Sequence, residues 1–337
     1  MASIHDVAKA AGVSVATVSK VVNGYPDVSD KTRKKVNKII EELRYHPNVM
    51  ARGLVKKRSW NVGVLINVPF TNPFVSELLE GIKTALEHSG YDLMKLSTRL
   101  DDPSYSFYEH CRSRSLDGVV IFGAEPDNKG VSDLIDSDIP VMFVDEDVTG
   151  PRTGSIMTDS RMALQMVVRH LYELGHRRIA YIAGSQGTAV AHLRKQGYVE
   201  GLQACGLACL DEYIEECDYT FDGGRQSASK LITIAHPPTA LVCVSDMAAF
   251  GAIHELMSRG LSVPTDISVV GFDNTYYAQV FRPGLTTVNQ NIHNIGIRCI
   301  EHLIRMIEQP DARPPAALEP PDLVVRETTA APAHLLG

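Results

Sequence analysis

The chain has six cysteines, and cysteine side chains can bind metal ions as thiolates or form disulfides. Three of them lie close together, Cys205, Cys209 and Cys217. No CxxC pair accompanies this cluster, and two of its members lie among small and apolar residues, which does not match a zinc site. We therefore expect free thiols and no bound metal, the state typical of cytoplasmic proteins.

The motifs of nucleotide-dependent and hydrolytic enzymes are absent. No G-x-G-x-x-G follows an expected strand, no Walker motif occurs, and the stretch IAGSQGTA lacks the spacing of either. No Ser-His-Asp or Cys-His arrangement follows from spacing, so His170, His176 and His192 are expected in core, capping or surface positions. The sequence predicts neither an enzyme nor a cofactor.

Basic side chains are concentrated at one end of the chain. Residues 1–59 hold 12 Lys and Arg against five Asp and Glu, a net charge of +7, whereas the remaining residues carry −14. The stretch YHPNVMARGLVKKRSW, residues 45–60, has five basic side chains and no acid. A basic head on an acidic body is typical of a nucleic-acid-binding segment, although a solvated terminus is the alternative at this point.

The basic head begins with two expected short helices. Ser3 precedes Asp6 by three residues, the spacing of an N-cap and its partner, and Gly12 is placed to end the first helix. Ser14 then caps a second helix whose inner stripe is valine-rich. Two helices joined by a few residues around a glycine predict a helix-turn-helix, whose second helix enters the major groove of DNA.

A third helix is expected over residues 28–45, with Ser29 as its cap. Its inner face is predicted to hold Val36, Ile39, Ile40 and Leu43. Its outer face is basic, which fits either a solvated surface or a position near phosphates. The basic residues are Lys31, Arg33, Lys34, Lys35 and Lys38.

The body alternates short apolar strands with amphipathic segments of helical length. This alternation predicts an α/β fold of parallel sheets covered on both faces, with enough strands for two sheets. Two such lobes bind ligands at the carboxyl ends of their strands. No apolar run approaches the ~20 residues that span a bilayer, and no secretory signal is expected. The expected strands are 61–67, 91–97, 117–123, 139–145, 177–184, 213–219, 239–245, 267–273 and the tail strand 323–328.

The head resembles a known family. The stretches IHDVAKAAGVSVATVSKVVNG, VSDKTRKKV and YHPNVMARGL, in this order, resemble the headpiece of the lac repressor (LacI/GalR) family of bacterial transcription regulators. The resemblance extends over essentially the whole chain. It implies a helix-turn-helix headpiece at 1–46, a hinge helix at 47–59, and a two-lobed body at 60–337 like a type I periplasmic binding protein.

The resemblance also implies lobe boundaries. The chain crosses between the lobes near Thr158, Asn289 and Leu318. The N-lobe is then about 61–158 plus 290–320, and the C-lobe is about 159–288 plus 321–332.

Carried onto this sequence, the resemblance implies a DNA-binding surface on the second helix and in the hinge. Val15 and Ala16 suit contact with a thymine methyl group, and Leu54 matches the family's minor-groove wedge. Pro47 begins the hinge segment and Gly53 weakens its helix propensity. The DNA-binding residues expected are Ser14, Val15, Ala16, Thr17, Ser19, Lys20, Asn23, Thr32, Asn48, Ala51, Arg52 and Leu54.

The family's effector pocket maps onto residues at strand ends. Their carboxylates, amides, guanidinium and aromatic rings suit a sugar, because vicinal hydroxyls take bidentate hydrogen bonds and C–H faces pack on rings. Structural roles remain open: a turn for Asp273, a surface ion pair for Arg194, core positions for Phe70 and Phe74. The effector residues expected are Phe70, Asn72, Phe74, Asp145, Arg194, Tyr219, Asp246, Asp273 and Gln290.

The partners implied are pseudo-palindromic operator DNA, a second copy of the chain, and a small sugar or sugar phosphate. The stretches GFDNT and RPGLTTVNQNI resemble the catabolite control branch, whose corepressor is the phosphorylated carrier protein HPr. Glu301 lies where that branch favours a basic residue, and a carboxylate repels a phosphate. Arg298 and Arg305 on the same expected helix keep this alternative open.

Overall fold

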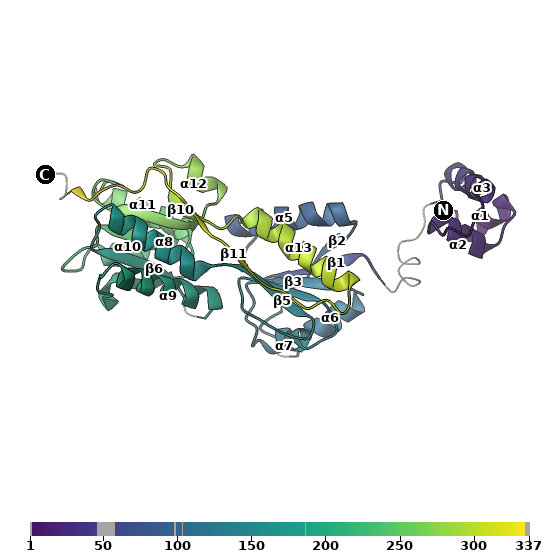
Figure 1. The fold of residues 1–337 in the computed structure, drawn as a ribbon, viewed down its shortest axis with the longest axis horizontal. Helices are drawn as coiled ribbons and strands as arrows, with labels where there is room; N and C mark the ends of the chain where they lie inside the picture. Colours follow the sequence, from purple (N-terminus) through teal and green to yellow (C-terminus); the bar gives the residue numbers. More distant parts are fainter. Residues whose placement is uncertain (1, 46–57, 98, 103, 186, 334–337) are drawn as a thin grey trace. The chain divides into compact units, whose positions relative to one another are not determined.

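The chain forms two compact units in this computed structural model (Figure 1). The first unit extends to Trp60 and the second begins at Asn61. The structure describes residues 2–45, 58–97, 99–102, 104–185 and 187–333. No helix in these ranges is long and apolar enough to cross a bilayer.

The headpiece contains three helices, α1 (Ile4–Ala11), α2 (Val15–Val22) and α3 (Asp30–Glu42). Ser3 forms a capping box with Asp6, and Gly12 ends α1 at a φ of 62°. The predicted caps Ser14 and Ser29 are also confirmed. These caps satisfy backbone N–H groups that short helices leave free. The common core is formed by Val7, Ala8, Ala11, Val18, Val21 and Val36.

The third helix is shorter than predicted. It ends at Glu42, so Leu43 is its C-cap and is 37% exposed, whereas the sequence placed Leu43 on the inner face. Ile39 and Ile40 are partly buried against the core. The helical spacing of apolar residues continues to Leu43, but the core of three short helices is too small to cover that side chain.

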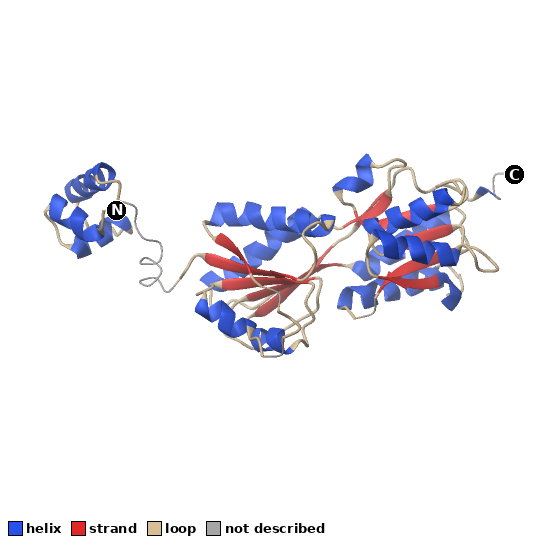
Figure 2. Cartoon of the chain, turned by 180° about the vertical axis from the view of Figure 1, so that it is seen from behind, coloured by secondary structure: helices blue, strands red, loops and turns tan. Residues whose placement is uncertain are grey.

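The N-lobe holds a six-stranded parallel sheet in the order β11-β5-β4-β3-β1-β2. Its strands are β1 (Asn61–Ile66), β2 (Asp92–Lys95), β3 (Gly118–Phe122), β4 (Val141–Val144), β5 (Thr153–Thr158) and β11 (Ala316–Glu319). One helix pair packs on each face, as Figures 1 and 2 show. The helices are α5 (Pro73–Ser89), α13 (Ile292–Glu308), α6 (Phe107–Ser113) and α7 (Lys129–Ile135).

The C-lobe repeats this plan in the order β12-β10-β9-β8-β6-β7, with only β12 antiparallel. Its strands are β6 (Ile179–Gly184), β7 (Ile214–Cys217), β8 (Ala240–Cys243), β9 (Ser268–Asp273), β10 (Thr286–Asn289) and β12 (Asp322–Val324). Its helices are α8 (Ser160–Glu173), α9 (Ala189–Ala204), α10 (Phe221–Leu231), α11 (Asp246–Ser258) and the short α12 (Tyr276–Val280). A 3₁₀ turn, Asp211–Tyr213, precedes β7.

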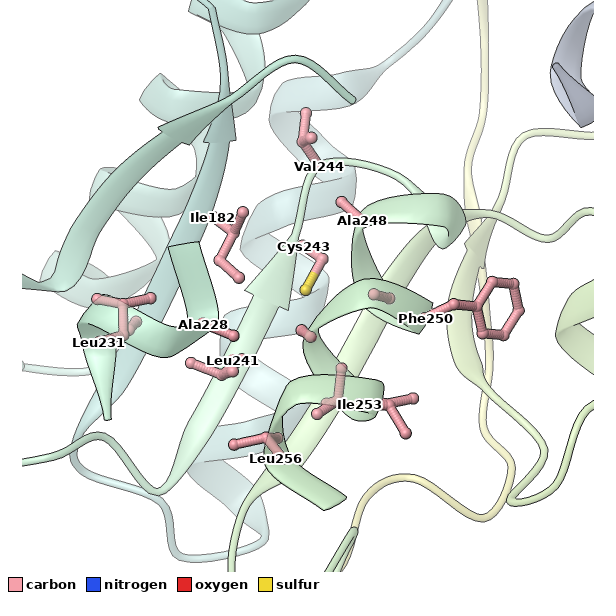
Figure 3. Packing of buried hydrophobic residues seen from close by; sticks show 14 of the residues in the cluster. Ile182, Ala228, Leu231, Leu241, Cys243, Val244, Ala248, Phe250, Ile253 and Leu256 are labelled. Carbon is pink, nitrogen blue, oxygen red and sulfur yellow. The ribbon is translucent and has the colours of Figure 1, made fainter. Parts of the chain in front are cut away.

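The C-lobe core lies between the sheet and the pair α10 and α11. Figure 3 shows Ile182 and Leu241 from the sheet packed against Leu231, Ala248 and Leu256 from the two helices. A second cluster fills the space beneath α8 and α9 on the other face. Burying both faces explains why the strands read as nearly continuous apolar runs.

The chain passes three times between the two sheets. The first passage follows Thr158 at the end of β5, and the second follows Asn289 at the end of β10. The third follows Glu319 at the end of β11, one residue after Leu318, near which the crossing was expected.

Three strands had no counterpart in the sequence-based assignment, β5, β10 and β11. Strand β5 reads TGSIMT and is buried along its whole length, although half of it is small and polar. Thr153 donates its hydroxyl to Ile135 O at 3.0 Å, which allows burial. Only the neighbouring strands make such a segment recognisable.

Two glycines let α5 and α13 approach closely. A Cβ on Gly81 would lie 2.0 Å from the carbonyl oxygen of His293, and one on Gly296 would lie 2.4 Å from that of Leu78. Both contacts are with backbone, which a side-chain rotation cannot relieve. The pair of glycines therefore sets the separation of these helices.

Gly81→Ala is expected to lower the free energy of unfolding by about 1–3 kcal/mol, because the helices must separate to admit the methyl group. Urea unfolding followed by circular dichroism measures the loss. Glu87→Ala, exposed on the same helix, is the control and should change stability by less than about 0.5 kcal/mol. Equal midpoints for the two variants would contradict the assignment.

Candidate functional site

A pocket of about 430 Å³ lies where the strands of both lobes end. The N-lobe contributes residues that follow β1, β3 and β4, and the C-lobe contributes residues that follow β6, β7, β8 and β9. Every lining segment thus follows the carboxyl end of a parallel strand, where α/β folds bind ligands. Of the residues expected at the effector site, the lining includes Asn72, Phe74, Asp145, Arg194, Tyr219 and Asp273.

The backbone is strained at three of these residues. Asp145, Tyr219 and Asp273 have φ values of 61°, 64° and 123°, and Asn274, which follows Asp273, has 58°. Residues other than glycine adopt this region at a cost and concentrate there at functional sites. The strain supports a binding role for this pocket.

Asp273 ends β9 and lies against Gln290. The Gln290 amide donates to Asp273 Oδ1 at 2.7 Å, and both side chains are buried. Burial raises the pKa of Asp273 well above its ordinary value, and the nearby Asp246 carboxylate adds to this effect. Gln290 does not line the pocket; it orients the carboxylate that does.

Asp246, also expected at the site, lies behind the pocket and not on its wall. It is fully buried and accepts from Thr287 Oγ1 at 2.6 Å, Thr275 N at 2.7 Å and Thr275 Oγ1 at 2.9 Å. Through these three hydrogen bonds, the Asp246 carboxylate at the start of α11 holds the turn after β9 in position. The sequence pattern at a strand end does not distinguish this supporting role from ligand contact.

Arg194 is buried, with 3% of its surface exposed, so the surface ion pair considered from the sequence is wrong. Its Nη1 donates to Val244 O at 2.7 Å, and its guanidinium lies 3.7 Å from the centre of the Phe272 ring. These contacts hold the planar group at the pocket wall.

Asp145 and Glu146 follow β4 on the N-lobe side. Burial raises the pKa of Asp145 to about 6, against the opposing effect of Arg194. Burial raises the pKa of Glu146 to about 7, and Glu146 accepts from Ala189 N, at the start of α9 in the C-lobe, at 3.4 Å. Glu146 was not among the residues expected, although it stands beside Asp145 in the stretch FVDED.

Tyr219 packs its ring over Gly184 at the end of β6. A Cβ on Gly184 would lie 2.3 Å from the Tyr219 hydroxyl oxygen, so a side chain there would displace the ring. Ser245 donates to Tyr219 O at 3.1 Å. Gly184 is the first glycine of the stretch IAGSQGTA, which matched no phosphate-binding motif. It therefore makes room for a pocket residue.

An aromatic wall closes the N-lobe side. Phe74 and Phe122 stack with ring centres 5.1 Å apart. Asn72 caps α5 by accepting from Phe74 N at 2.9 Å, so its amide oxygen already has a structural partner. Phe70 is 50% exposed and does not line the pocket. The lining residues that sequence reasoning missed include Phe122, Glu146, Thr188, Asp218, Ser245, Met247 and Thr275.

In the headpiece, α2 presents Ala16 and Lys20 on its exposed face, while Val15 packs partly against the core. Lys20 forms an ion pair with Asp27, whose pKa this contact lowers. Asn23 donates to Ser19 O at 2.9 Å, and the hydroxyls of Thr17 and Thr32 lie 2.9 Å from those of Ser14 and Ser29. The expected hinge residues Asn48, Ala51, Arg52 and Leu54 lie outside the described residues.

The six cysteines are free, as predicted. Within the described ranges, no three His, Cys, Asp or Glu side chains form a group that could hold a metal ion. His176 is buried in the core, where its ring lies 2.9 Å from Thr239 Oγ1.

Headpiece and body define a class of protein: a helix-turn-helix unit joined to a periplasmic-binding-protein-like α/β unit. The family described as bacterial regulatory proteins, lacI family, matches residues 3–48, and a periplasmic binding protein-like domain matches 168–329. Catabolite control protein A from Priestia megaterium is 36% identical over 296 residues, covering 87% of this chain and 89% of that protein. The chain belongs to the lacI family of bacterial DNA-binding transcriptional regulators.

Other relatives agree with this assignment. The HTH-type transcriptional repressor CytR from Escherichia coli (strain K12) is 32% identical over 333 residues, covering 98% of this chain and 97% of the repressor. The lac repressor dimer bound to operator and the anti-inducer ONPF matches with a TM-score of 0.84 and 28% identity, over 98% of this chain and 99% of that one. A CelR–cellobiose complex matches with a TM-score of 0.72 and 28% identity, over 97% and 100%.

The pocket carboxyls predict a pH-dependent stability. Because burial raises the pKa of Glu146 from its ordinary value to about 7, its stabilising contribution is full below about pH 4.5 and is lost as the pH rises through 7. Glu146→Gln removes this loss. The drop in free energy of unfolding between pH 5 and pH 8 should shrink by roughly 1–2 kcal/mol, after allowance for solvent screening.

Urea unfolding at the two pH values tests this, with the exposed Glu87→Gln as the control variant. Parallel pH dependences for the Glu146→Gln and unmodified chains would show that Glu146 is not buried in solution.

Proposed function

We propose that the chain is a cytoplasmic repressor of carbohydrate-utilisation genes, controlled by a small sugar effector in the pocket between the lobes. The observation that carries this proposal is the pocket itself, where Arg194 of α9 meets Asp273, which ends β9 on a strained backbone. The CelR–cellobiose complex, a relative of similar fold, has a sugar as its ligand. The helix-turn-helix supplies the DNA-binding half of the proposal.

The pocket chemistry suits adjacent hydroxyl groups. The Asp273 carboxylate, oriented by Gln290, accepts from two neighbouring hydroxyls, and the Arg194 guanidinium donates to a hydroxyl or ring oxygen. The stacked rings of Phe74 and Phe122 provide a flat apolar surface for the C–H face of a sugar ring.

DNA recognition is proposed for the exposed face of α2. Ala16 suits a thymine methyl group, and Lys20 exchanges its contact with Asp27 for a base or a phosphate. The hinge, including Leu54, is proposed to enter the minor groove between two headpieces. Pairing with a second copy of the chain matches the two-fold symmetry of a pseudo-palindromic operator.

An apolar patch supports the homodimer. Exposed side chains of α11 and of the segment around α12 provide a surface suited to a second copy. They are Met257, Tyr276, Tyr277, Val280 and Phe281.

Two hydrogen bonds between the lobes offer a route from ligand to hinge. Tyr276 N donates to Glu77 Oε1 at 2.9 Å, and Ala189 N donates to Glu146 Oε2 at 3.4 Å. Each joins an N-lobe carboxyl to the first turn of a C-lobe helix. A ligand that changes the lobe separation favours one arrangement over the other, with a typical coupling of about 1–3 kcal/mol.

A second candidate is control by phosphorylated HPr, supported by the identity to catabolite control protein A. Two features of α13 weigh against it. Arg298 is paired with the buried Glu319 at 2.6 Å, and the exposed Glu301 would repel a phosphate. We therefore favour the sugar effector.

Selection from a random duplex library with the full chain tests DNA recognition. We expect enrichment of a pseudo-palindromic sequence, and a loss of about tenfold or more in affinity for Ala16→Glu, because the new carboxylate meets the groove. Glu87→Gln in the other unit is the control. Uniform, weak, salt-dependent binding to any duplex would exclude a sequence-specific regulator.

Thermal-shift screening against sugars, sugar phosphates and phosphorylated HPr identifies the effector class. Asp273→Ala should abolish the shift produced by any pocket ligand while leaving operator binding measurable. A shift that persists in Asp273→Ala would place the ligand elsewhere, and a shift only with phosphorylated HPr would favour the second candidate.

A further inference from the structure

The charged side chains that line the pocket are unevenly balanced. Four lining residues are acids, one is an arginine, and none is a lysine or histidine. The charged residues are Asp145, Glu146, Asp218, Asp273 and Arg194. Glu125 and Asp127 add negative charge beside Glu146. Burial raises the pKa of these carboxyls, so a cation bound beside them favours their ionised form, whereas an anion finds one basic side chain in the lining.

Arg194 does not compensate for the acids as a phosphate-binding group. Its Nη1 donates to Val244 O, its Nε lies 3.4 Å from Ser160 Oγ, and its plane covers the Phe272 ring. Its positive charge already acts on both Asp145 and Asp273. The lining holds one basic side chain, and its guanidinium is already engaged, so a phosphate finds no second cation there.

Asp145 and Glu146 have acceptor capacity that the protein does not fill. Asp145 Oδ1 is buried and has no hydrogen-bond partner among the described residues. Among the described residues, Glu146 receives only the long contact of 3.4 Å from Ala189 N. Two adjacent carboxyls with free acceptors suit a group that carries several donors and no acceptor, which describes a primary ammonium group.

We infer that the effector is a hydroxyl-rich molecule with a primary amino group, an amino sugar or amino polyol, whose nitrogen binds Asp145 and Glu146 while Asp273 and Arg194 bind its hydroxyls. Phosphorylated sugars are excluded by the same carboxylates. This inference rests on the proposed function, because it takes the pocket as the effector site.

The protonation of the two carboxyls provides an independent readout. Asp145 faces Arg194, and Glu146 faces Asp145, Glu125 and Asp127. A bound ammonium group favours the ionised carboxylates, so binding releases protons. Affinity for the amine should rise between pH 5 and pH 7, because Asp145 and Glu146, whose pKa burial raises to about 6 and about 7, ionise in this range while the amine keeps its proton.

The test uses isothermal titration calorimetry on the full chain with matched sugars: glucosamine, galactosamine and mannosamine, their parent hexoses, their N-acetyl forms and the hexose 6-phosphates. We expect one of the amines to bind at least tenfold more tightly at pH 7.0, where its amino group is protonated, than its parent and its N-acetyl form, and no 6-phosphate to bind. N-acetylation keeps the ring and removes the charge, so it isolates the ammonium contact.

The double variant Asp145→Asn and Glu146→Gln should reduce the preference for the amine over its parent to about onefold and remove its pH dependence. Melting temperature and operator binding establish that the variant folds. Glu80→Gln, exposed on α5, is the matched control and should keep the preference.

Three results would overturn the inference: a 6-phosphate that binds as well as the amine, a parent hexose that binds equally well, or no binding by any amine. The proposed function fails by a different result, when an amine binds but changes operator affinity by less than twofold. The two failures are therefore distinguishable.

Discussion

Burial of carboxyl groups at the ends of parallel strands is the constraint on which the body of this protein depends. Asp246 is fully buried, and three donors from Thr275 and Thr287 stabilise it there. That arrangement positions the turn after β9, and with it Asp273. Without those donors, a carboxyl at this depth would be strongly destabilising.

The same constraint determines which polar groups the pocket contains. Strand ends contribute carboxyls because inner strands such as β3, β4 and β8 are apolar on both faces and leave only their termini for polar side chains. Asp145, Glu146 and Asp273 are partly desolvated by the surrounding lobe, so the pKa of each is raised. A ligand that supplies hydrogen-bond donors or positive charge stabilises these buried carboxyls. Ligand binding therefore depends on the same desolvation of carboxyls that affects the stability of the fold.

Much of the architecture was predictable from local patterns. The caps Ser3, Ser14 and Ser29, the turn at Gly12 and the strand ends at Asp145 and Asp273 follow from residue type and spacing. The polar strand β5 was not predictable, because its burial depends on the hydrogen bond that Thr153 donates to Ile135 and on pairing with β4 and β11. Leu43 was placed on the wrong face because helical period does not report where the core ends.

The sequence by itself determined the family, the helix-turn-helix and the presence of polar residues at strand ends, since these depend on short-range spacing. Only the tertiary structure decided which of those residues share a pocket: Asp246 and Gln290 lie behind it, Phe70 lies off it, and Glu146 joins it. The reason is that neighbours at one sheet edge come from strands far apart in the chain. The burial of these side chains and their hydrogen bonds are established only when the strands and helices of the lobes pack together.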